Sequence, residues 1–243
     1  GYEAEGGGSK ITYRSFPEEG YLDALLNALA AGRGPDMFMI HNTWLPKDKD
    51  KLAPVPPEQY NYTEFQSSFP TAVLHDFSDE EGFIYALPIS LDTLATIYNQ
   101  DYFDAAFLTS PPETWTELRN AVPKLRRVNA RGQIVRAGAA IGGSAENIDT
   151  AVDLIALLML QSGVGIVEKD GQYVDLDEDR DEGFGAGSAL NFYLQFSSAG
   201  GPYYTWNANQ PDALEGFING SVAVFFGYAS HLETIKSRAP FLP

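Results

Sequence analysis

The chain has 243 residues, of which 44% are hydrophobic and 13% aromatic, so it can bury a core in one large domain or two smaller ones. With 16 Lys and Arg against 33 Asp and Glu, the formal net charge is −17, and a polyanion such as nucleic acid would be repelled. There is no cysteine, which excludes disulfides, thiolate metal sites and cysteine nucleophiles.

The first part of the chain is predicted to alternate strands and helices. Residues 1–9 contain a run of glycines and are predicted to be a tail or linker. Residues 10–16 have the alternating, β-rich pattern of a strand, and residues 18–31 carry leucines at helical spacing. Residues 36–40 are predicted to form a short buried strand. Strand, helix and strand in this order indicate an α/β layered domain.

The remainder continues the mixed pattern. Two strand-like runs are predicted within residues 82–99, separated by Pro88. Further strands are predicted over residues 135–143 and 221–228, and helices over residues 69–77, 101–107, 111–128, 147–162, 181–198, 211–220 and 230–238. Thr114 and Glu117 have the spacing of a capping box at the start of one of these helices.

Five segments follow one another in a recognisable order. They are "LLNALAAGRGPDMFMIHNTWL" (25–45), "YALPISLDTLATIYNQDYF" (85–103), "PPETWTEL" (111–118), "YYTWN" (203–207) and "ALEGFINGSVAVFFGY" (213–228). Together they resemble the extracellular solute-binding proteins of ABC importers, in the sugar-binding group that is like maltose-binding protein. The resemblance runs over most of residues 10–240.

The resemblance implies an α/β fold with the two-lobe architecture of periplasmic binding proteins. Hinge strands would join the lobes, and the ligand would lie in the interlobe cleft. Residues 10–90 would form part of the N-terminal lobe and the hinge, and residues 91–243 an incomplete C-terminal lobe. Because chains of this family are longer at both ends, we interpret the sequence as a partial chain.

The same resemblance implies a function. The protein would bind a sugar or oligosaccharide and deliver it to the membrane subunits of an ABC importer, without enzymatic activity and without a cofactor. It would be a monomer located outside the cell or in the periplasm, either free or anchored by lipid.

Sugar recognition requires aromatic rings for the C–H faces and carboxylate or amide groups for the hydroxyls. Trp206 is predicted to be a stacking platform, and Asp92 to accept ligand hydroxyls as the resemblance implies. Gly227 would let the backbone approach the ligand closely, and Asn147 would either cap a helix or face the ligand. The full set of predicted ligand contacts is Asn42, Trp44, Asp92, Asn147, Tyr204, Trp206, Gly227 and Tyr228.

Other signals are weaker. Residues 175–183, "DLDEDRDEG", imitate a calcium loop, but Arg180 and Ala186 stand where that loop needs Gly and Glu, so a solvated acidic loop is predicted. The three histidines have no spacing typical of a zinc site. Two alternatives remain open: a secreted glycosidase with paired carboxylates, and a binding protein for a peptide, a polyamine or a metal chelate.

Overall fold

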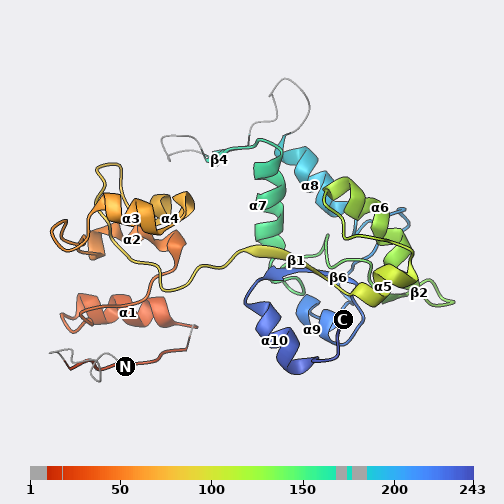
Figure 1. Cartoon of the computed structure of the whole chain (residues 1–243), viewed down its shortest axis with the longest axis horizontal. Helices are drawn as coiled ribbons and strands as arrows, with labels where there is room; N and C mark the ends of the chain where they lie inside the picture. The colour runs from red at the N-terminus through yellow and green to blue at the C-terminus, as the bar shows by residue number, and fades with distance from the viewer. Residues whose placement is uncertain (1–9, 18, 168–173, 177–184) are drawn as a thin grey trace. The chain divides into compact units, whose positions relative to one another are not determined.

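Two units make up the chain, Gly1–Ser90 and Leu91–Pro243 (Figure 1). The computed structural model describes residues 10–17, 19–167, 174–176 and 185–243. The predicted N-terminal tail and most of the acidic loop predicted over residues 175–183 therefore lie outside the described residues. Each unit is described below by itself.

The described part of unit 1 is helical. Its elements are α1 (Tyr21–Ala30), η1 (Asn42–Trp44), α2 (Leu45–Asp48), η2 (Lys49–Lys51), α3 (Tyr62–Ser68) and α4 (Thr71–Phe77). The strands predicted over residues 10–16 and 36–40 are wrong, because the structure has no regular strand there. Tyr13 and Met37 are 79% and 80% exposed, and no described strand pairs with either segment. A β-rich pattern needs a neighbouring strand for its backbone groups before it becomes a sheet.

The core of unit 1 lies under α3 and α4. Asn61 and Glu64 form a capping box at the start of α3, since the side chain of each accepts the backbone N–H of the other at 3.0 and 3.2 Å. The capping box fixes where α3 begins, and Phe65 on this helix is fully buried. The remaining members of this buried cluster are Val73, Leu74, Phe77 and Ile84.

A central strand pair runs through unit 2. Strand β1 (Leu94–Tyr98) pairs antiparallel with β6 (Val224–Tyr228), with Leu94 opposite Tyr228 and Tyr98 opposite Val224. Two further antiparallel pairs are short, and their strands are β2 (Arg127–Val128), β3 (Ile134–Arg136), β4 (Ile166–Val167) and β5 (Val174–Asp175). Strand β6 is buried along its length except at Tyr228, so its sequence is almost wholly apolar.

Helices cover this pair. They are α5 (Gln100–Ala105), α6 (Trp115–Leu125), α7 (Ala151–Gln161), α8 (Ala186–Leu194), α9 (Ala213–Ile218) and α10 (His231–Arg238). Figure 1 shows α7 and α8 on one side of the β1–β6 pair and α9 and α10 on the other. Thr114 caps α6 as predicted, but the carboxylate of Glu117 accepts the N–H of Glu113 instead of that of Thr114, so the capping box is incomplete.

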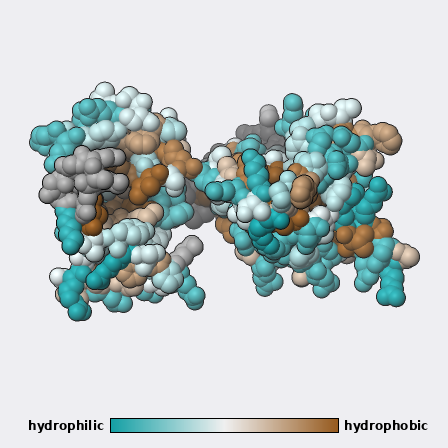
Figure 2. Space-filling view, turned by 60° about the horizontal axis from the view of Figure 1, so that its bottom comes forward, coloured by the Kyte–Doolittle hydropathy of each residue, from teal (hydrophilic) through white to brown (hydrophobic). Residues whose placement is uncertain are grey.

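The surface reflects the acidic composition. Figure 2 shows hydrophilic side chains over much of the visible face, interrupted by hydrophobic patches. Every helix among the described residues is too short or too polar to cross a membrane.

Candidate functional site

Asp92 lies where the strand pair of unit 2 begins. The β1–β6 register brings the start of β1 beside the end of β6, so Asp92 is close to Ser230. Its carboxylate accepts the backbone N–H of Thr93 at 2.9 Å and that of Ser230 at 3.3 Å. Hydrogen bonding from Ser230, above all from its side chain, lowers the pKa of the Asp92 carboxyl below its usual value, against a smaller opposing effect of burial. Asp92 is therefore an ionised, exposed carboxylate held by the backbone.

Tyr228 is the last residue of β6 and contacts a second carboxylate. Its hydroxyl donates a hydrogen bond to Asp153 in the first turn of α7, and its backbone N–H donates to Nδ1 of His231 at 3.0 Å. The hydrogen bond to Asp153, with burial and the negative charges of Asp153 and Asp92, raises the pKa of Tyr228 to about 12. Tyr228 is thus a neutral phenol under the influence of two carboxylates.

The start of α7 is tied to β6 by a buried contact. Thr150, the N-cap residue of α7, donates its hydroxyl proton to the carbonyl of Phe226 at 2.8 Å. A carboxylate in the first turn of a helix is also stabilised by the helix dipole. The position of α7 therefore holds Asp153 beside Tyr228. This part of α7 faces solvent, since Asp153 is exposed and the preceding residue, Val152, is 68% exposed.

We refer to Asp92, Asp153 and Tyr228 as the carboxylate–tyrosine group. Within the described residues, neither Asp forms an ion pair with Lys or Arg. The group can accept hydrogen bonds from ligand hydroxyls and offers part of an aromatic ring. Asp153 was not among the predicted contacts. Its signal in the sequence was a single carboxylate within the otherwise apolar run of residues 151–160.

The prediction that Trp206 is a stacking platform is wrong. The indole is fully buried, at 0% exposure, within the core of unit 2. Its N–H donates to Oδ1 of Asn147 at 3.0 Å, and the Asn147 amide donates to the carbonyls of Asn207 and Gln210 at 3.1 and 3.2 Å. Asn147 is therefore neither a helix cap nor a ligand contact, because its hydrogen-bonding groups are all used inside the fold.

Packing within unit 2 explains why a glycine occupies position 227. It is buried in β6, and a Cβ at this position would lie 2.3 Å from Cε1 of Phe225 and 2.6 Å from Nδ1 of His231. The glycine makes room for these two rings, and its close approach to a ligand stays a prediction. Strand geometry explains the contact, because residues two apart lie on the same face.

Tyr204 is half-buried, with one polar contact at its hydroxyl. The hydroxyl oxygen accepts a hydrogen bond from the side-chain amide of Asn207 at 2.7 Å. The backbone carbonyl of Tyr204 accepts a hydrogen bond from the Arg126 side chain. The hydroxyl proton has no acceptor among the described residues. Ligand contact by Tyr204 stays a prediction, as it does for Asp92 and Tyr228.

Asn42 and Trp44 lie together on η1 of unit 1. The side-chain N–H of Asn42 donates to the carboxylate of Asp76 at 2.9 Å. This hydrogen bond fixes the orientation of the Asn42 amide, including its side-chain carbonyl oxygen. Trp44 is partly buried and its ring stacks on Tyr21, with the ring centroids 6.1 Å apart. Their ligand contacts also stay predictions.

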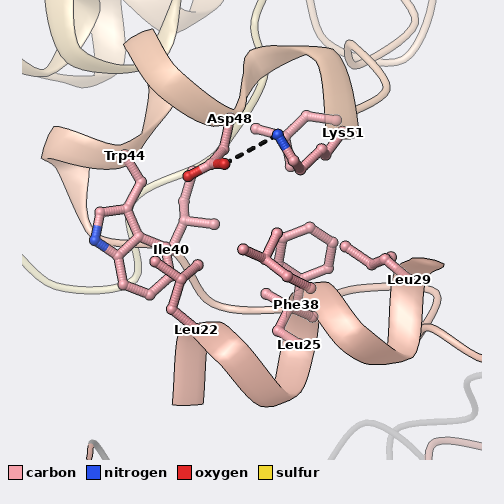
Figure 3. A pocket seen from close by; sticks show the side chains of 10 residues that line it. Leu22, Leu25, Leu29, Phe38, Ile40, Trp44, Asp48 and Lys51 are labelled. Carbon is pink, nitrogen blue, oxygen red and sulfur yellow. Dashed lines mark ion pairs between the residues drawn. The ribbon is translucent and has the colours of Figure 1, made fainter. Parts of the chain in front are cut away.

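An apolar crevice separates α1 from η1 and α2 (Figure 3). Leu22, Leu25 and Leu29 point into it from α1, and Trp44 lies at its edge beside Ile40. The buried carboxylate of Asp48 is balanced by Lys51 at 3.1 Å. With a volume of about 10 Å³, roughly the room that a single water molecule needs, the crevice is too small for a sugar.

A larger surface concavity of about 500 Å³ lies elsewhere on unit 1, around Tyr85. Lys49 lies 4.8 Å from the centroid of that ring and pairs with Asp79 at 2.8 Å. The concavity contains none of the predicted contacts. No group of three or more His, Asp or Glu side chains that could hold a metal ion occurs in the described part of the chain.

Comparisons with known proteins agree on one family. A family model described as bacterial extracellular solute-binding protein matches residues 1–241. A binding protein of Brucella abortus is 28% identical over 170 residues, which are 70% of this chain and 39% of that protein. A maltotriose-binding protein of Pyrococcus abyssi is 29% identical over 102 residues, which are 42% of this chain and 21% of that one.

A solved structure has the same fold. It is the ABC substrate-binding protein of Listeria monocytogenes in complex with cycloalternan, with a TM-score of 0.71 and 19% identity. The match covers 99% of this chain and 59% of that one, so this chain spans little more than half of it. The similarity confirms the predicted α/β fold class.

Proposed function

Because the chain belongs to the family of bacterial extracellular solute-binding proteins, we propose that it binds a sugar or oligosaccharide for import by an ABC transporter. Of the relatives reported above, one is named a maltotriose-binding protein and one was solved in complex with cycloalternan. The family is one of solute-binding proteins, and we propose that this chain performs no reaction on its ligand.

The observation that carries the proposal is the carboxylate–tyrosine group. Its two carboxylates can accept hydroxyl hydrogen bonds, which are about twice as strong as those between neutral groups. Asp92 supplies its charge from a backbone-fixed position, and Asp153 orients the Tyr228 ring through the phenol hydroxyl. A neutral polyol can satisfy both carboxylates without a counter-ion, whereas an anionic solute would be repelled by them.

The partners follow from the family. We propose that the membrane subunits of an ABC importer receive the ligand and that the protein acts as a monomer outside the cell or in the periplasm, free or tethered by lipid. The chain spans less than two thirds of the length of the relatives reported above, so these statements about the whole protein are proposals.

The test is ligand binding measured by thermal unfolding. Mono-, di- and trisaccharides of glucose and mannose are titrated separately against the protein. A saccharide at about 100 times its Kd should stabilise the native state by about 2.7 kcal/mol, which raises Tm in a concentration-dependent way. Spermidine and a short neutral peptide serve as the non-sugar arms. If Tm rises with either of them and with no saccharide, the carbohydrate proposal is overturned.

A further inference from the structure

Unit 2 carries a basic segment that contrasts with the acidic composition of the chain. Six of the 16 Lys and Arg residues fall within residues 119–136, and no Asp or Glu does. This segment comprises most of α6 and the whole β2–β3 hairpin, which lie together in unit 2 (Figure 1). None of the six cations forms an ion pair with a carboxylate in the described part of the chain. We call this set the basic face, and its members are Arg119, Lys124, Arg126, Arg127, Arg131 and Arg136.

The hairpin is fixed against the end of α6. Arg136 donates from Nε and Nη2 to the carbonyl of Leu125, the last residue of α6, at 3.0 and 2.9 Å. In the β2–β3 register, Arg127 is directly opposite Arg136. Like charges at directly opposite positions destabilise a strand pair. The stability of the hairpin therefore does not explain why both positions carry arginine.

Two further arginines of the basic face lie against one loop. Arg126 donates a hydrogen bond to the carbonyl of Tyr204, and the guanidinium of Arg119 lies 5.2 Å from the ring centroid of Tyr203. Neither contact neutralises a cation, because a carbonyl group and an aromatic ring have no net charge. Nε of Arg119 is buried and has no hydrogen-bond partner among the residues that the structure describes. Contacts within this part of the chain thus leave the charge of the basic face uncompensated.

The hairpin presents its charge to solvent. Residues 127–133 are all exposed, and so is Lys124 at the end of α6. Two exposed valines lie among the arginines, since Val128 is 52% exposed and Val135 is 53% exposed. Cations with exposed apolar side chains between them are typical of surfaces that bind the headgroup region of a membrane.

We propose that the basic face docks unit 2 on a membrane surface that contains anionic phospholipids. A guanidinium group binds a phosphate through two parallel hydrogen bonds, and all but one of the six cations are arginines. Val128 and Val135 can bury apolar surface at the same interface. This docking does not involve the sugar and goes beyond the proposed function.

The net charge of −17 does not oppose docking at contact distance. Ions screen exposed charges beyond about 8 Å at physiological ionic strength, so the charges nearest the lipid decide the interaction. A polyanion that is free in solution can meet the protein from any side, and most sides are acidic. A membrane surface that meets the basic face contacts only that side.

The test measures binding of the full chain to lipid vesicles by cosedimentation at low ionic strength. Vesicles of phosphatidylglycerol and phosphatidylcholine in equal parts are compared with vesicles of phosphatidylcholine alone. The wild-type protein should bind the anionic vesicles and not the neutral ones. Salt at about 1 M should abolish the binding, because it shortens the screening length to about 3 Å.

A triple variant, Lys124→Gln with Arg127→Gln and Arg131→Gln, removes three exposed cations of the basic face. Arg126 and Arg136, which contact backbone carbonyls, stay in place. Each basic residue near a charged lipid surface contributes about fivefold in affinity, so the triple variant should bind anionic vesicles about 100-fold more weakly. Its Tm should equal that of wild type, which checks that the fold is retained.

The matched control is Arg33→Gln with Lys47→Gln and Lys236→Gln. It changes the net charge by the same amount at exposed positions outside the basic face. Its affinity for anionic vesicles should stay within about twofold of wild type, because these charges lie away from the docked side.

Four results would overturn the proposal. They are no binding of wild type to anionic vesicles, equal binding to neutral vesicles, equal weakening in the triple and control variants, and binding to soluble heparin or polyglutamate without binding to vesicles. The last result would identify a soluble polyanion as the partner. Saccharide binding is measured separately by the thermal assay, so failure of vesicle binding leaves the proposed function standing.

Discussion

The indole of Trp206 and the side chain of Asn147 are buried together, joined by a 3.0 Å hydrogen bond from the indole N–H to Oδ1. The two residues belong to loops 59 positions apart in the sequence. Gly143 lies against the same indole, and a Cβ there would come within 2.5 Å of its Cδ1. This contact explains why an aromatic-rich stretch occurs in a loop: the loop closes the core of unit 2.

We expect Trp206→Phe to lower the free energy of unfolding by about 2–4 kcal/mol, because the smaller ring leaves a cavity and the Asn147 oxygen loses its donor. Urea denaturation measures the loss. Trp115→Phe is the control, since the Trp115 N–H bonds only to the exposed Gln161, and a smaller change is expected. A Trp206→Phe protein as stable as wild type but deficient in sugar binding would contradict the structural role.

We expect Gly227→Ala to destabilise the protein by about 1–3 kcal/mol without any ligand present, because the added methyl group overlaps Phe225 and His231. The midpoint of urea denaturation reports this change. The double variant Gly227→Ala with His231→Ala should recover part of the loss by removing one of the two overlaps. Unchanged stability of Gly227→Ala would show that the rings can move aside.

Asp92→Asn should weaken saccharide binding by about 10-fold or more, because a charged acceptor contributes about 1.5–3 kcal/mol per hydrogen bond and the amide oxygen is neutral. Calorimetric titration measures the affinity. The Tm without ligand should change little, since Asn keeps an acceptor for the N–H of Thr93. Asp101→Asn, an exposed change on α5, serves as the control. Wild-type affinity in Asp92→Asn would remove this residue from the site.

The raised pKa of Tyr228 predicts that the protein loses stability at high pH. Its folded-state pKa is raised to about 12, so its contribution is complete below pH 10 and is lost as the pH rises towards 12. In Tyr228→Phe this part of the loss should disappear. Spectrophotometric titration of the 13 tyrosines should show one fewer late-ionising group. Tyr193, whose pKa burial raises to about 12, remains as an internal reference. An unchanged titration curve would contradict the contact with Asp153.

The lowered pKa of Asp79 predicts that the protein loses stability at low pH. Against the effect of burial, hydrogen bonds from Lys49, Phe83 and Tyr85 lower its pKa to about 2. A depressed carboxyl pKa stabilises the fold above about pH 4, and this contribution is lost as the pH falls towards 2. Asp79→Asn should therefore cost about 1 kcal/mol at pH 7 and nothing further in acid. Circular dichroism against pH, compared with Asp50→Asn, tests this. Identical acid transitions in wild type and Asp79→Asn would contradict it.

The helices were the most predictable part of the fold. The leucine spacing predicted α1, the capping residue Thr114 predicted the start of α6, and the apolar run over residues 221–228 predicted β6. These signals are local, because they depend on which side chains share one face or satisfy one helix end. The strands predicted over residues 10–16 and 36–40 failed because strand formation depends on a partner elsewhere in the chain.

The same division holds for the site. The sequence by itself determined the fold class, the acidic charge that excludes polyanions, and the proximity of Asp92 to the start of a strand. Only the tertiary structure decided that Trp206, Asn147 and Gly227 belong to the core and that Asp153 lies against Tyr228. The physical reason is that burial and side-chain contact depend on segments far apart in sequence. An aromatic residue in a loop has the same local pattern whether its ring faces solvent or closes a core.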